Sequence, residues 1–261
     1  MDITSIIGLL AGLAALIGGF SLEGGSLSGL LQPNAALIVF GGTFAAVLIS
    51  FPASKLLQVP AALRFAFGAK ADTREANAEE FISMAAVTRR GGVLALEKRA
   101  EEHPDRFTRE GLLLIVDGID PEEVRQILEL DMDARELKHN SYAKIFEAAG
   151  GYAPTMGIIG TVMGLIQVLG SLTDPSNLGA SIAVAFTATL YGVASANLIF
   201  LPLASKIKSR SQSELAGMEM QMVGILSLQN GDAPHLVRKK LSSFLTDSSA
   251  SRGSSQDRGM L

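Results

Sequence analysis

Four segments of the chain contain no Asp, Glu, Lys or Arg, and they limit the folds that it can adopt. These segments are residues 3–22, 24–54, 148–173 and 175–205. A helix of about 20 mostly apolar residues is long enough to cross a bilayer. The sequence therefore predicts an all-α integral membrane protein with four transmembrane helices.

The positions of the basic residues predict how these helices are oriented. All 22 Lys and Arg lie in two stretches, 55–144 and 206–258. The short connectors around Glu23 and Asp174 carry one acid each and no base. Because basic loops remain on the cytoplasmic side of a membrane, we expect both termini to be cytoplasmic. A large cytoplasmic insertion then separates the second and third membrane helices.

Apolar residues make up 48% of the chain and are gathered in blocks, which argues against one soluble core.

The Ser-rich, charged C-terminus has a composition typical of disorder. The expected parts are transmembrane helices one and two (1–54), a helical cytoplasmic domain (55–149), transmembrane helices three and four (150–205), a cytoplasmic C-terminal helical segment (206–245) and a disordered tail (246–261).

A helix start is recognisable inside the insertion. Asp120 has the character of an N-cap, Pro121 suits the first helical position, and acids follow in the first turn. No helix breaker comes after them until Gly150 and Gly151. This helix is therefore predicted to continue directly into the third membrane helix.

Composition argues against several functions. The chain has no Cys, which excludes disulfides and thiolate catalysis, and its net charge of −4 gives no reason to expect nucleic-acid binding. His103, His139 and His235 lack metal-ligand spacing and are expected at the surface. No nucleophile–base arrangement or phosphate loop is present. We predict no enzyme activity, metal or cofactor.

The third and fourth membrane helices carry matching faces of small residues with one hydroxyl in the middle. The two sets are Gly157, Thr161, Gly164 and Val168, and Ala185, Thr189, Gly192 and Ala196. Small faces permit close helix packing in lipid, which is one interpretation. The other is that both Thr hydroxyls face a polar path. The spacing alone leaves both open.

The membrane segments contain no Asp, Glu, Lys, Arg or His. Ion routes through bilayers usually require an ionisable side chain at depth. If this chain conducts ions, a partner must therefore supply that group, whereas a membrane scaffold would need none.

Pro154 and Pro202, near the inner ends of helices three and four, are predicted to be structural kinks or a pair of hinges.

Residues 152–166, Tyr-Ala-Pro-Thr-Met-Gly-Ile-Ile-Gly-Thr-Val-Met-Gly-Leu-Ile, resemble the helix-three signature of flagellar stator A subunits, the MotA/PomA/MotP family. A looser form, Gly-Thr-Val-x-Gly, also occurs in ExbB/TolQ energisers. Segments 89–97 and 183–192, followed by Asn197 and Pro202, are similar to the stator subunits specifically. The order of two helices, insertion and two helices also matches, since ExbB-like proteins have three membrane helices.

This resemblance implies a machine in the bacterial inner membrane, surrounded by lipid. A homo-oligomeric ring of A subunits, expected to be pentameric, surrounds the helices of a MotB/PomB-like B subunit. The B subunit supplies a membrane Asp and a peptidoglycan anchor. Ion flow then turns the ring, which delivers torque to the rotor protein FliG.

The resemblance also assigns roles to residues of this chain. Arg89 and Glu97 map to the charges that contact the rotor, with Arg90, Lys98 and Glu101 as helpers. A break at Gly91-Gly92 would present them from two differently aimed segments. The alternative is that these are ordinary solvated charges, because a single surface pair contributes only about 0–1 kcal/mol.

Thr161 and Thr189 map to the ion path. Family members that use sodium tend to carry Thr at both positions, so sodium is favoured as the transported ion, with the proton as the alternative. Thr187 contributes if helix four is rotated. The competing functions are an ExbB/TolQ-type proton-driven energiser and a non-conducting membrane scaffold.

Overall fold

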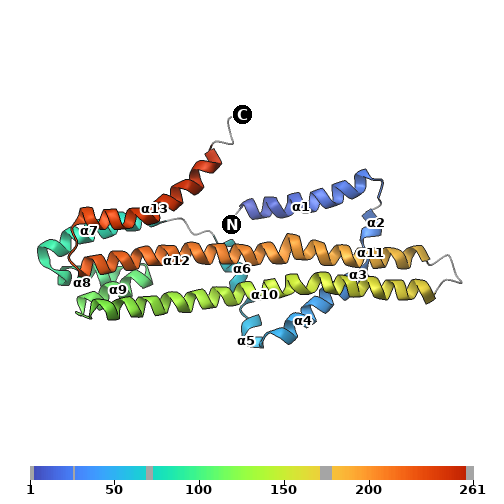
Figure 1. Cartoon of the computed structure of the whole chain (residues 1–261), viewed down its shortest axis with the longest axis horizontal. Helices are drawn as coiled ribbons and strands as arrows, with labels where there is room; N and C mark the ends of the chain where they lie inside the picture. Colours follow the sequence, from blue (N-terminus) through green and yellow to red (C-terminus); the bar gives the residue numbers. More distant parts are fainter. Residues whose placement is uncertain (1–2, 26, 69–72, 171–177, 257–261) are drawn as a thin grey trace. The chain divides into compact units, whose positions relative to one another are not determined.

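The computed structural model describes residues 3–25, 27–68, 73–170 and 178–256. All regular elements within these ranges are helices (Figure 1), as the sequence predicts. Four of them are long and apolar enough to cross a membrane. The chain divides into two compact units: residues 1–69 with 138–210, and residues 70–137 with 211–261. The predicted turn around Asp174 lies outside the described residues.

The first unit contains the membrane-spanning segments. Its N-terminal elements are α1 (Ile3–Leu22), α2 (Leu27–Leu30), α3 (Pro33–Ala36), a π-helical turn η1 (Leu37–Gly41), α4 (Gly42–Ser50), α5 (Ala53–Leu56) and α6 (Val59–Phe67). The second span, Leu27–Ser50, therefore consists of α2, α3, η1 and α4 in succession. Pro52 follows that span, in extended backbone at the start of α5.

The third span is the C-terminal part of α10 (Pro121–Gly170), a helix of 50 residues. The predicted continuity is confirmed, because Gly150 and Gly151 lie inside this helix. The Asp120 side chain accepts a hydrogen bond from the Glu122 backbone N–H at 2.9 Å, as expected of a residue at a helix start.

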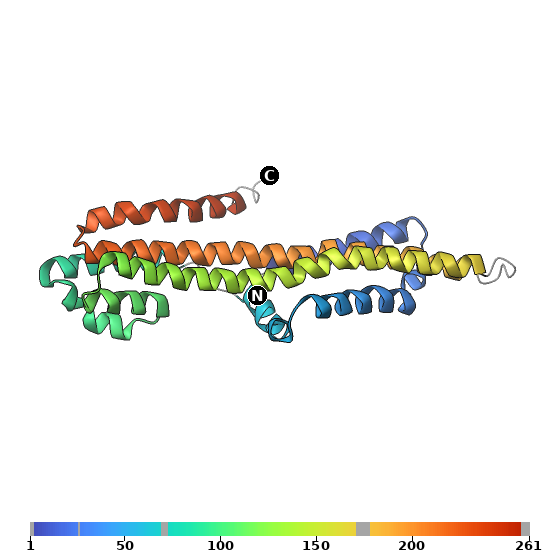
Figure 2. The ribbon, with the colours of Figure 1, turned by 60° about the horizontal axis from the view of Figure 1, so that its bottom comes forward.

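The fourth span is α11 (Leu178–Ser195), which continues through a second π-helical turn, η3 (Ala196–Phe200), into α12 (Leu201–Gln229). In both ribbon views, α11 and the C-terminal part of α10 run side by side (Figures 1 and 2). A π-helical turn adds a residue to a helix without ending it.

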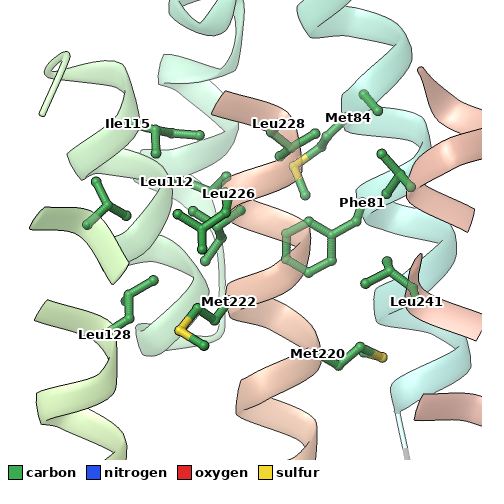
Figure 3. Packing of buried hydrophobic residues seen from close by; sticks show 14 of the residues in the cluster. Phe81, Met84, Leu112, Ile115, Leu128, Met220, Met222, Leu226, Leu228 and Leu241 are labelled. Atoms are coloured by element: carbon green, nitrogen blue, oxygen red, sulfur yellow. The ribbon is translucent and has the colours of Figure 1, made fainter. Parts of the chain in front are cut away.

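The second unit holds the remaining elements around one apolar core. These are α7 (Arg74–Gly91), a 3₁₀ turn η2 (Val93–Leu96), α8 (Glu97–Glu102), α9 (Arg106–Val116), α13 (Pro234–Gln256), the start of α10 and the end of α12. Figure 3 shows Phe81 of α7, Leu112 of α9, Leu128 of α10 and Leu226 of α12 in this core. Full burial of such a side chain stabilises the fold by about 1.5–3 kcal/mol.

One feature of this unit differs from the sequence-based expectations, because His103 is buried, with 9% exposure, rather than at the surface. Its ring lies 3.4 Å from Glu80, whereas His235 is exposed as expected.

Candidate functional sites

The third and fourth spans pack so closely that their backbones touch. A Cβ atom at Gly157 would lie 2.9 Å from the Ala188 carbonyl oxygen, and one at Gly192 would lie 2.5 Å from the Ala153 carbonyl oxygen. At Gly164 it would lie 2.7 Å from the Ala185 Cβ. Only glycine fits these positions without movement. The small faces therefore serve close helix packing in this structure, the first of the two interpretations.

A polar pair lies in the middle of the same interface. The Thr161 and Thr189 hydroxyls are hydrogen-bonded to each other, and both residues are half-buried. The Thr161 hydroxyl is also 3.1 Å from the carbonyl oxygen of Gly157 and 3.0 Å from that of Ala185. A hydroxyl carries one proton, so the Thr161 hydroxyl can donate fully to only one of these oxygens at a time. Two hydroxyl oxygens and two carbonyl oxygens thus gather at one point between α10 and α11.

Thr187 does not join this pair. Its hydroxyl donates to the Ala183 carbonyl oxygen at 2.7 Å, and the residue is only 6% exposed. Successive helical residues are separated by about 100°, which places Thr187 about 200° from Thr189 around α11. The structure therefore brings together two of the three candidate threonines.

The two candidate hinge prolines occupy different surroundings. Pro154 lies inside α10 and is half-buried, with its Cα 3.1 Å from where a Cβ at Gly192 would stand. Pro202 is exposed and is the second residue of α12, directly after the η3 turn. Proline has no N–H to donate to the preceding turn, and α10 nevertheless remains one helix.

Sequence reasoning missed an aromatic and cationic cluster in the first unit, built from α6, α10 and α12. His139 is 8% exposed, which corrects its expected surface position, and its ring stacks on Phe65 at 4.0 Å between centroids. The Arg210 guanidinium lies 5.6 Å from the same Phe65 ring, and Lys206 lies 5.5 Å from the Phe67 ring. The sequence signal for this cluster was the amphipathic pattern of residues 59–67. It shows that one face of the helix is buried, but the residues that cover this face lie far along the sequence.

The charges predicted to contact a rotor lie on both sides of one turn in the second unit. Arg89 and Arg90 lie in the last turn of α7, and Gly92 then adopts a φ of +75°, a left-handed conformation that favours glycine. The remaining candidates lie on α8. The five exposed side chains are Arg89, Arg90, Glu97, Lys98 and Glu101.

Within the described part of the chain, these five side chains form no hydrogen bond or ion pair. Other charges of this unit are paired: Arg238 contacts Glu79 through two hydrogen bonds of 2.7 and 3.1 Å, and Lys240 lies 2.5 Å from Asp232. The structure therefore places Arg89 and Glu97 near one turn with their charges available to another molecule.

The fold and these sites define a multi-pass helical membrane protein with a close-packed, hydroxyl-bearing helix pair and a charged helical unit outside the membrane. Two family descriptions match the chain. "Motility protein A N-terminal" covers residues 6–91, and "MotA/TolQ/ExbB proton channel family" covers residues 99–220.

Similar proteins extend over nearly the whole chain. Motility protein A of Bacillus subtilis is 39% identical over 94% of this chain and 91% of its own length. Chemotaxis protein PomA of Vibrio alginolyticus is 34% identical over 95% of this chain and 96% of its own length. The solved flagellar MotAB stator complex from Bacillus subtilis contains a chain with a TM-score of 0.89 and 37% identity, covering 96% of this chain and 99% of that one.

The chain belongs to the MotA/PomA family of flagellar stator A subunits. The predicted family and the all-helical fold are confirmed. The match to the motility-specific N-terminal description argues against the ExbB/TolQ-type alternative, and membership of a channel family argues against a non-conducting scaffold. Its members are stator ion-channel subunits and not enzymes, as predicted.

Proposed function

We propose that this chain is the ring-forming A subunit of a stator that converts inward ion flow into torque. In this proposal it assembles as a pentameric ring in the bacterial inner membrane, with both termini in the cytoplasm. A MotB/PomB-like B subunit passes through the ring, anchors it to peptidoglycan and supplies the membrane Asp. The rotor protein FliG receives the torque.

This proposal rests on one combined observation: oxygen atoms gather between α10 and α11, and the membrane segments of this chain have no carboxylate beside them. The α10–α11 interface offers the Thr161 and Thr189 hydroxyls and two carbonyl oxygens. The membrane segments of this chain contain no Asp, Glu, Lys, Arg or His. Conduction therefore requires a carboxylate from a second chain, which agrees with the solved relative being a MotAB complex.

Sodium is the coupling ion that we favour. A hard cation that loses its water needs several oxygen ligands, and hydroxyls with carbonyls can supplement a single carboxylate. A proton needs only a titratable acid and a relay. Each charge that crosses the membrane releases about 2.3 kcal/mol per 100 mV whichever ion carries it, so the energy available does not distinguish the two.

Torque passes, in this proposal, through the exposed charges beside Gly92. A contact that steps from one rotor position to the next must release as easily as it forms. Exposed ion pairs of about 0–1 kcal/mol suit that requirement, and complementary charges govern the rate and register of the encounter more than its affinity. Pro154 and Pro202 are proposed as hinges that let helices three and four move during each step.

Ion flux into liposomes tests the central claim. The purified chain alone should not dissipate a sodium or proton gradient, whereas the chain co-purified with its B subunit should. A complex in which the membrane Asp of the B subunit is replaced by Asn serves as the matched control and should be silent. Robust flux through this chain by itself would refute the requirement for a partner's carboxylate.

A further inference from the structure

An open recess of about 480 Å³ lies in the second unit beside the candidate rotor contacts. It is lined by Ser83, Ala86, Val87, Arg90, Gly91 and Ala95. The first five belong to α7 and the last to η2, so the recess lies where α7 ends and the chain turns back. A Cβ atom at Gly91 would lie 3.0 Å from the Ala95 Cβ, so the two elements approach closely there.

The lining is mostly apolar, although this unit lies outside the membrane segments. Leu94, on the adjoining turn, is 70% exposed. Single exposed apolar residues are common and need no explanation. A concave apolar surface next to an exposed Leu is different, because it can enclose an apolar side chain of another molecule. Central apolar contacts of this kind carry much of the energy of protein interfaces.

The rim of the recess is cationic. Arg90 lines it and has no ion-pair partner in the described part of the chain. Arg99 of α8 lies close to one of the lining residues, since its guanidinium is 3.5 Å from the Ser83 hydroxyl. Two guanidinium groups around an apolar floor are complementary to an apolar side chain flanked by carboxylates.

We propose that this recess receives an apolar side chain from an acidic helix of the rotor protein. The inference rests on the proposed function and adds a shape-selective contact to the charge contacts of Arg89 and Glu97. The charges attract the rotor helix, and the recess sets the position at which it stops. A neighbouring copy of this chain is the other candidate occupant, but the position of the recess beside the candidate rotor contacts favours the rotor protein.

Filling the recess tests the proposal without altering any charge. Ala86→Leu and Ala95→Leu place added bulk on two different elements of the lining. Ala76→Leu is the matched control, because Ala76 is exposed on the same helix and outside the recess. Each variant is made in the full stator complex, and three properties are measured: B-subunit co-purification, ion flux in liposomes, and crosslinking of the complex to the rotor protein in cells.

Both filling variants should weaken rotor crosslinking about tenfold, the effect of losing one well-packed interface contact. Co-purification and ion flux should match the unmodified complex, and Ala76→Leu should behave as the unmodified protein. Unchanged crosslinking in both filling variants would overturn the inference, and so would an equal loss in Ala76→Leu. A changed complex size with normal rotor crosslinking would assign the recess to a neighbouring copy and would also overturn it.

A charge-reversed variant separates this inference from the proposed function. Reversing Arg89→Glu together with Glu97→Lys should abolish rotor crosslinking if the torque surface is where we place it. If this variant loses crosslinking and the filling variants do not, only the recess inference fails. If the charge-reversed variant crosslinks normally, the proposed torque surface fails as well.

Discussion

Replacing Gly192 by Ala is expected to push α10 and α11 apart. The new Cβ would stand 2.5 Å from the Ala153 carbonyl oxygen and 3.1 Å from the Pro154 Cα, whereas ordinary contact begins at 3.4 Å. Both atoms belong to the backbone, so no side-chain rotation can relieve the clash. The helices must separate by close to an ångström at this level.

Overpacking of this kind typically costs about 1–3 kcal/mol. For a chain of this size that corresponds to a fall in Tm of about 2–12 °C. The same separation would lengthen the contacts around Thr161, which depend on the close approach of α10 and α11. We therefore expect both a lower Tm of the detergent-solubilised stator complex and a reduced ion flux in liposomes.

Gly151→Ala is the matched control, because no atom lies within 4 Å of a Cβ at that position. It exchanges the same two residues within a helix, and the better helix propensity of Ala should leave Tm unchanged or raise it slightly. If Gly192→Ala melts and conducts like Gly151→Ala, the two backbones are not in contact as described. The interpretation of the glycines as packing residues would then be wrong.

The remaining predictions concern the ion path and the hinges. Thr161→Val and Thr189→Val should each raise the sodium concentration needed for half-maximal swimming speed about tenfold at fixed pH, because each removes one oxygen ligand worth about 1.4 kcal/mol. Thr187→Val should leave that concentration unchanged, since its hydroxyl lies away from the pair; speed that is independent of sodium in the unmodified protein, yet abolished by a protonophore, would contradict the sodium assignment. Pro154→Ala and Pro202→Ala should reduce swimming speed while the protein remains folded in the membrane, since a helix can regain the missing hydrogen bond. Loss of either variant from the membrane fraction would indicate a structural role for that proline.

Periodic and local features of this protein could be predicted from the sequence. The absence of charge marks the four spans, and the Asp120-Pro121 start together with the missing breaker predicts the continuous α10. The identical spacing on helices three and four gives Thr161 and Thr189 matching surroundings of small residues, and in the structure the two hydroxyls are hydrogen-bonded to each other. In each case the information lies in the order of residues along a helix.

Features that depend on distant partners could not be predicted. His139 is buried because Phe65 of α6 stacks on it, and nothing near His139 in the sequence indicates that contact. The recess beside Arg90 likewise forms only once α7 ends and η2 folds against it. The two π-helical turns were also missed, because a single added residue does not disturb the apolar character by which a membrane span is recognised.

The π-helical turn η3 changes which face of the fourth helix its later residues occupy. An added residue rotates everything after it by about 100° around the helix axis, relative to an uninterrupted α-helix. Upstream of the turn, Ala185 and Ala188 are buried, and downstream Ala204 and Ile207 enter the cluster with Tyr142. Deleting one residue from η3 would restore a regular helix of normal hydrophobicity. It would also rotate Ala204 and Ile207 out of that cluster. The buried residues before η3 and those after it could then no longer both contact their present neighbours.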